Sequence, residues 1–240
     1  MQVDVFIPCF IDQLYPETAK NFIKVLEKAG CEAFYNPEQT CCGQPAFNSG
    51  YWKEALTVAS KFIHDFDSGR PVVAPSASCT GFIRNYYQKL FEDDKLLYSA
   101  NQLRKRVYEF SDFVVNHLKV TDFGAKFPHR VTFHDSCSGL REYGIGEEPR
   151  KLLAKVKGLE LIEMEKRDTC CGFGGTFMAK FHHISTAMAE QKVENAIKTG
   201  AEYIVSTEAS CLMNLDSYIR KQKLPIKTIH LADLLVSGWK

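Results

Sequence analysis

The chain has 240 residues, of which 45% are hydrophobic and 25% are charged, so it can form one large domain or two units of about 120 residues with ordinary cores. Its formal net charge of +1 gives no basis for binding nucleic acid or a charged membrane surface. No apolar run approaches the ~18 residues needed to cross a bilayer, and the N-terminus has the pattern of a first strand, so we expect a cytoplasmic protein without a membrane span.

Short apolar segments alternate with amphipathic ones along the chain, a pattern typical of parallel strands joined by crossover helices. The first half predicts strands at 3–7, 32–35 and 72–74 and helices at 17–29, 51–66 and 80–90. The second half predicts strands at 131–134, 160–164, 203–206 and 226–229 and helices at 150–156, 184–199, 212–222 and 231–235. The fold class is therefore expected to be α/β, with parallel sheets.

The two halves of the chain are similar to each other, which indicates a duplication. Each contains a strand that runs into a cysteine, then a Thr-Cys-Cys-Gly sequence, then an apolar strand followed by Ala-Ser-Cys. The matched cysteines are Cys9 and Cys137, Cys41 and Cys170, and Cys79 and Cys211, with offsets of 128, 129 and 132 residues. We predict a first unit of residues 1–100, a connecting segment of 101–129 and a similar second unit of 130–240. A pseudo-twofold axis would relate the units and turn their cysteine edges toward a shared cleft.

Eight of the nine cysteines form two sets of four, one set in each unit. The first set is Cys9, Cys41, Cys42 and Cys79, and the second set is Cys137, Cys170, Cys171 and Cys211. Because ligands of parallel sheets bind where the strands end, each set is expected to converge at one sheet edge. Four thiolates at one edge would repel one another unless a bound metal compensated their charge. In a reducing cytosol this many cysteines favour metal-binding or catalytic thiols over disulfides.

Three kinds of chemistry fit such a set. Four thiolates suit an iron–sulfur cluster, most simply one [4Fe–4S] cluster per set and thus one or two per chain. Zinc also binds four cysteines in a closed tetrahedral site, although zinc sites usually use Cys-x-x-Cys pairs, which this sequence lacks. Thiol–disulfide exchange is the third possibility, but it needs two or three thiols rather than two sets of four. The sequence has no dinucleotide-binding or P-loop motif, so no nucleotide cofactor is expected.

Three further residues have roles that the sequence leaves open. Cys31 follows a helix-ending glycine and enters a strand, which fits a core position better than a ligand position. His134 lies three residues before Cys137 and could donate a hydrogen bond to a cluster, carry a proton, or be a structural histidine. Arg141 could pair with a cluster or an anionic substrate, or face solvent.

Longer segments carry a resemblance to known proteins. The repeated order Cys…Cys-Cys-Gly…Cys resembles the cysteine-rich CCG domain of heterodisulfide reductase and of glycolate oxidase iron–sulfur subunits. The segments 41–50, 75–79 and 168–177 are similar to the lactate utilization protein A family in particular. The resemblance implies an iron–sulfur redox subunit of an L-lactate (2-hydroxy acid) oxidation complex. Such an oxidoreductase subunit would transfer electrons during the conversion of lactate to pyruvate and be active only with partner subunits.

The resemblance also implies ligands and partners. The iron ligands of the clusters would be Cys9, Cys41, Cys42, Cys79, Cys137, Cys170, Cys171 and Cys211. The partners would be a sister iron–sulfur protein with ferredoxin-type clusters and a third lactate-utilization protein. Because this sequence has no closely spaced Cys-x-x-Cys-x-x-Cys segment of its own, a separate electron-carrying partner is expected.

One departure from the related motif bears on the chemistry. In heterodisulfide reductase the motif ends in Cys-x-x-Cys, which gives five cysteines per unit and permits noncubane clusters. Here the last position is Phe82 in the first unit and Asn214 in the second. Noncubane clusters and disulfide reduction therefore do not transfer directly to this chain. Two alternatives to the iron–sulfur protein stay open: a zinc-stabilised assembly scaffold without redox activity, and a thiol–disulfide reductase of the heterodisulfide reductase type.

Overall fold

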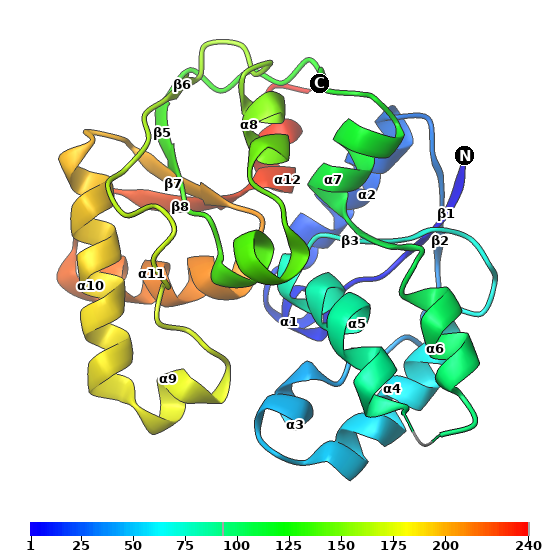
Figure 1. Ribbon diagram of the computed structural model, residues 1–240. Coiled ribbons are helices and arrows are strands. Elements are labelled where there is room, and N and C mark those ends of the chain that lie inside the picture. The colour runs from blue at the N-terminus through cyan, green and yellow to red at the C-terminus, as the bar shows by residue number, and fades with distance from the viewer. Residues whose placement is uncertain (93, 240) are drawn as a thin grey trace.

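Two four-stranded parallel sheets form the framework of the protein (Figure 1), as seen in a computed structural model that describes residues 1–92 and 94–239. The strand order is β2-β1-β3-β4 in the first sheet and β6-β5-β7-β8 in the second, so the two sheets have the same topology. The expected α/β class with two similar tandem units is therefore confirmed.

Helices and strands alternate along both units. The first sheet and its helices comprise β1 (Gln2–Val5), α1 (Cys9–Leu14), α2 (Pro16–Lys28), β2 (Glu32–Tyr35), α3 (Gln44–Asn48), α4 (Trp52–Asp65), β3 (Val72–Ala74), α5 (Ala77–Leu90), α6 (Leu97–Leu103), β4 (Val107–Glu109), α7 (Phe110–Asp112) and the π-helical turn η1 (Phe113–His117). The second comprises β5 (Arg130–Phe133), the π-helical turn η2 (Ser138–Tyr143), α8 (Glu147–Leu153), β6 (Glu160–Leu161), α9 (Thr176–Lys180), α10 (His182–Lys198), β7 (Tyr203–Ser206), α11 (Ala209–Gln222), β8 (Lys227–His230) and α12 (Leu231–Leu235).

Several elements differ from the sequence expectation. The segment expected to connect the units contributes β4, which pairs in parallel with β3 and completes the first sheet. The strand expected at 160–164 is only two residues long, β6. Helices α5 and α11 begin three residues earlier than expected, so that Cys79 and Cys211 lie in their first turns. In α5 the Ser76 side chain caps the helix by accepting a hydrogen bond from the Cys79 N–H, which accounts for the earlier start.

Side chains of the central strands pack on both faces of each sheet, as parallel sheets covered by helices require. In β3, Val72 and Ala74 face a core built with α4, α5 and α6, whereas Val73 faces the opposite core. In β7 the neighbours Ile204 and Val205 divide in the same way between two cores. The apolar run of each strand is therefore explained by burial on both sides.

A single hydrophobic core extends across both units. It contains Val3 and Val5 of β1 together with Val131 of β5, and residues of α2, η1, α8 and α12. Figure 1 shows α12 of the second unit beside α2 of the first. At this junction the Asp233 carboxylate accepts hydrogen bonds from the Thr18 hydroxyl at 2.7 Å and the Asn21 amide at 2.9 Å. Continuous packing and these polar contacts hold the two sheets in a defined relative position.

Among residues 1–92 and 94–239, no helix combines the length and apolar character needed to cross a membrane.

A candidate metal centre between the two units

All eight cysteines of the two sets line one cavity of about 480 Å³. The cavity lies where the carboxyl ends of both sheets meet, and each unit contributes one set. All nine cysteines of the chain are free thiols. The structure thus brings together, in one place, the eight residues that the sequence singled out.

The sheet topology explains why each set converges. In the order β2-β1-β3-β4 the chain leaves β1 toward one neighbour and β3 toward the other, so a crevice forms between the ends of these two strands. Cys9 follows β1 and Cys79 follows β3, while the Cys-Cys-Gly segment follows β2 at the side of the same crevice. The second sheet repeats this arrangement with β5, β6 and β7.

The four thiols of each set contact one another in series. In the first set Cys41 lies between Cys9 and Cys42, and Cys42 in turn contacts Cys79. Hydrogen bonds from the thiols of Cys42 and Cys9 hold the pKa of Cys41 well below its ordinary value. The second set has the same series, Cys137, Cys170, Cys171 and Cys211. Sulfur atoms this close together form a compact donor set for a thiophilic metal.

The glycine after each cysteine pair has a specific role in the backbone. Gly43 and Gly172 have φ of 93° and 89°, in the left-handed region that glycine adopts without strain. In this conformation the Gly43 N–H points back to the Cys41 Sγ, and the Gly172 N–H to the Cys170 Sγ, both at 3.4 Å. Backbone N–H groups directed at cysteine sulfur stabilise thiolates and tune clusters bound to them.

The second cysteine of each Cys-Cys pair accepts a hydrogen bond at its backbone carbonyl group. The Tyr87 hydroxyl donates to the Cys42 carbonyl at 2.7 Å, and the Asn214 amide donates to the Cys171 carbonyl at 2.8 Å. Asn214 is one of the two positions where the related motif has a further cysteine. The other, Phe82, is buried against Phe47 with ring centroids 5.2 Å apart. Asn214 therefore supports the second pair directly, whereas Phe82 belongs to the hydrophobic core that also contains Cys42. No sequence pattern indicated the role of Tyr87.

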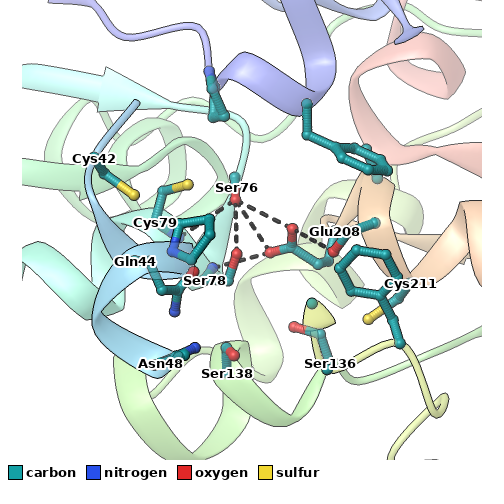
Figure 2. A pocket seen from close by; sticks show the side chains of 18 of the residues that line it. Cys42, Gln44, Asn48, Ser76, Ser78, Cys79, Ser136, Ser138, Glu208 and Cys211 are labelled. Atoms are coloured by element: carbon teal, nitrogen blue, oxygen red, sulfur yellow. Dashed lines mark hydrogen bonds between the residues drawn. The ribbon is translucent and has the colours of Figure 1, made fainter. Parts of the chain in front are cut away.

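A buried carboxylate lies between the two cysteine sets. Figure 2 shows Ser76 and Ser78 of the first unit directed at Glu208 of the second. The Glu208 carboxylate accepts from the Ser78 N–H at 2.9 Å and from the Ser76 and Ser210 hydroxyls at 3.2 and 3.1 Å. Burial raises the pKa of this carboxyl, and the hydrogen bonds from the serines oppose the rise. Ser76 and Glu208 occupy matching positions three residues before Cys79 and Cys211, so this contact joins equivalent points of the two units.

The residues whose roles the sequence left open have different environments. Cys31 is buried in the hydrophobic core that the units share, in agreement with a structural role. Arg141 is exposed, and its guanidinium donates to the Asp168 carbonyl at 3.2 Å. His134 is fully buried beside the second set, and burial together with the nearby Lys192 cation lowers its pKa to about 3. The imidazole is therefore neutral at physiological pH.

The donor chemistry of the cavity fits a thiophilic metal or cluster. Eight sulfur atoms, two backbone N–H groups directed at sulfur, and partial burial are the features that iron–sulfur and zinc sites share. Cys41 and Cys170 are partly exposed, whereas their neighbours Cys42 and Cys171 are buried. Each set therefore has a solvent side and a protein side.

Comparison with known proteins agrees with this geometry. The family model of the cysteine-rich domain CCG matches residues 3–84 and 131–216, once in each unit. Lactate utilization protein A of Geobacillus is 41% identical over 238 residues, covering 99% of this chain and 100% of the relative. The chain belongs to the lactate utilization protein A family. Lactate utilization protein A 1 of Bacillus mycoides, also in this family, is 42% identical over 237 residues, covering 98% of this chain and 96% of the relative.

The fold recurs outside the lactate utilization protein A family. The crystal structure of a hypothetical protein from Helicobacter pylori superposes with a TM-score of 0.64 at 11% identity. The match covers 100% of this chain and 49% of the Helicobacter chain, so this chain spans about half of that protein. At this level of identity the similarity concerns the fold alone.

Proposed function

We propose that this chain is an iron–sulfur redox subunit that transfers electrons during the oxidation of L-lactate to pyruvate, or of a related 2-hydroxy acid. The observation that carries the proposal is the convergence of two four-cysteine sets on one cavity. Family membership supports lactate as the substrate, because the relatives are named for lactate utilization. A cytoplasmic location and action with partner subunits are part of the same proposal.

The residues present would hold a cluster in each set. Cys9, Cys41, Cys42 and Cys79 would bind one, and Cys137, Cys170, Cys171 and Cys211 the other, with [4Fe–4S] as the simplest type. When bound, such clusters supply one-electron redox chemistry. Oxidation of a 2-hydroxy acid to a 2-oxo acid releases two electrons and two protons, so two one-electron sites match the electron count. A sister iron–sulfur protein with ferredoxin-type clusters and a third lactate-utilization protein would supply the remaining steps.

The protein around each set has three functions in this proposal. The N–H groups of Gly43 and Gly172 stabilise charge on the sulfur of the preceding pair. The hydroxyl of Tyr87 and the amide of Asn214 orient the pairs through their carbonyl groups. Phe173 lines the cavity and packs against Phe10, with ring centroids 5.6 Å apart, which keeps water from one side of it.

The test is anaerobic reconstitution with iron and sulfide, followed by iron and acid-labile sulfide analysis and EPR of the reduced protein. We expect wild type to contain both elements in cluster stoichiometry, and Cys41→Ser and Cys170→Ser each to lose the signal of one set. Cys31→Ser is the matched control, because Cys31 lies in the core away from the cavity and its loss should leave iron content unchanged. Protein with neither iron nor sulfide after reconstitution would overturn the proposal.

The same experiment separates the alternatives. Stoichiometric zinc without visible absorbance would support an assembly scaffold, since four cysteines can also form a closed zinc site. Turnover of a small disulfide that Cys41→Ser abolishes while metal content stays constant would support a thiol–disulfide reductase. The lowered pKa of Cys41 is the observation that favours the reductase as second candidate.

A further inference from the structure

The two cysteine sets differ at the position just after the first strand of each unit. The second unit has His134 there, and the first unit has Phe6, at the offset of 128 residues that relates Cys9 to Cys137. Phe6 is fully buried and packs edge-on against Phe62, with ring centroids 4.7 Å apart. The same place beside the second set therefore holds an imidazole instead of an apolar ring.

The backbone of His134 is held firmly by β7. Its N–H donates to the Val205 carbonyl at 2.8 Å, and its carbonyl accepts from the Ser206 hydroxyl at 3.0 Å. The side chain is fully buried, yet neither ring nitrogen has a hydrogen-bond partner among the residues that the structure describes. The Arg167 backbone lies close enough to the ring to favour its protonated form, but the contact does not have the geometry of a hydrogen bond. A buried polar group without a partner is destabilising, so such a group in a native protein calls for a ligand or another explanation.

The unpartnered imidazole lies next to two thiols of the second set. A ring nitrogen of His134 and the Sγ atoms of Cys171 and Cys211 all lie within 4.8 Å of one another. A metal with bonds of about 2.0–2.3 Å to nitrogen and sulfur holds its ligand atoms roughly 3–4 Å apart, so small side-chain rotations would let the imidazole replace one of these thiols as a ligand. Cys171 and Cys211 are also buried, which places His134 on the protein side of the set.

We propose that His134 takes the place of one of the four cysteines of the second set as a nitrogen ligand of its metal centre, which makes the two centres of the chain chemically different. The inference deepens the proposed function and rests on it for the presence of a cluster. Histidine in place of a cysteine thiolate removes a negative charge from the centre and raises its reduction potential, as in Rieske clusters. The Lys192 ammonium acts in the same direction, because it is buried near Cys171 and Cys211 and donates to the Lys166 and Arg167 carbonyls at 2.7 and 3.0 Å. The first set should therefore give electrons to the second.

Pulsed EPR on the anaerobically reconstituted and reduced protein tests the ligand directly. We expect wild type to show the strong ¹⁴N coupling of a metal-bound imidazole, and His134→Phe to lose it while retaining the signal of the first set. Phenylalanine is chosen because it already occupies the matching position 6. If His134→Phe does not fold, His134→Leu provides the same comparison. A reconstituted cluster in the second set without imidazole coupling, or with coupling that His134→Phe leaves unchanged, would overturn the inference.

A second probe keeps the inference testable if no iron–sulfur cluster forms. Co²⁺ alone is titrated into full-length protein in which Cys41→Ser and Cys42→Ser disable the first set. We expect His134→Phe in this background to bind Co²⁺ about tenfold more weakly or worse, a loss at least equal to that of an orienting residue. His129→Phe is the control, because His129 lies outside the cavity and pairs with Glu202. Equal Co²⁺ affinity with and without His134 would refute the nitrogen ligand, whereas failure of iron and sulfide to bind would refute only the proposed function.

Discussion

Replacement of Gly172 by alanine should destabilise the protein more than the same replacement at Gly30. Both glycines have left-handed φ, 89° and 85° respectively, so the conformational cost of a side chain is nearly the same at the two positions. Their surroundings differ. A Cβ on Gly172 would lie 2.5 Å from the Ser185 carbonyl oxygen in α10, whereas a Cβ on Gly30 would have no atom of the described residues within 4 Å apart from its chain neighbours.

The magnitude follows from these contacts. Left-handed alanine costs about 1–2 kcal/mol, partly offset by about 0.4–1 kcal/mol from the reduced freedom of the unfolded chain, so Gly30→Ala should cost roughly 1 kcal/mol. In Gly172→Ala the Cβ and the Ser185 oxygen must separate by at least 0.5 Å to reach the 3.0 Å limit of real Cβ contacts. Overpacking of this kind adds about 1–3 kcal/mol. We therefore expect Gly172→Ala to be less stable than Gly30→Ala by about 1–3 kcal/mol, or about 2–12 °C in Tm for a chain of this size.

The assay is urea unfolding of the reduced, metal-free variants, with iron binding measured separately. Because α10 carries Ser185 and must move away from the Cys-Cys-Gly turn, Gly172→Ala should also lose iron from the second set, while Gly30→Ala retains it. Equal destabilisation of the two variants would refute the argument that the glycine is needed for close approach of α10. It would leave left-handed φ as the sole reason for this glycine.

Three further outcomes can be checked on the same protein. Burial raises the pKa of the Glu109 carboxyl from 4.5 to about 8. The contribution of this group to the free energy of unfolding should therefore be largest below pH 4.5, and it should fall by up to about 1.4 kcal/mol per pH unit between pH 4.5 and pH 8. Glu109→Gln should remove that slope in urea titrations, and an identical slope in both proteins would contradict it. Glu208→Ala leaves the Ser78 N–H without its buried acceptor, so the free energy of unfolding should fall by about 1–3 kcal/mol and hydrogen exchange at the start of α5 should become faster. Unchanged exchange would argue against a link between the units. Cys31→Ala should cost about 1 kcal/mol and leave the iron content of reconstituted protein as in wild type, so loss of iron would make Cys31 part of the site.

Local patterns in the sequence were sufficient for much of the fold. The strands at 32–35, 72–74 and 203–206 and the helix at 231–235 have the bounds that the pattern predicted. These segments are apolar runs or amphipathic repeats bounded by clear helix or turn signals, so their structure depends mainly on their own residues. Strand β4 escaped prediction because it directly follows the charged run 104–106 and ends in Glu109, so it lacks the apolar run that marks the strand at 72–74.

The sequence predicted the cysteine donors of the site but not the residues that surround them. The duplicated spacing identified all eight cysteines, because the offset of about 130 residues is visible in the sequence itself. The contact between Ser76 and Glu208 joins residues 132 positions apart, and neither has a local pattern that signals it. For His134 the sequence left a structural role open, and only its burial without a hydrogen-bond partner beside Cys171 distinguishes it.

Strand periodicity and cysteine spacing were enough to predict a duplicated α/β protein with two sets of four thiols, because both are local properties that repeat along the chain. Only the three-dimensional packing shows that the expected shared cleft is one cavity lined by both sets, and that a buried imidazole lies beside the second set where the first has the apolar ring of Phe6. The physical reason is that relative placement of the units depends on the core they share and on polar contacts more than 100 residues apart, such as Thr18 to Asp233. Such contacts arise from the packing of whole faces of helices and sheets, which no short segment encodes.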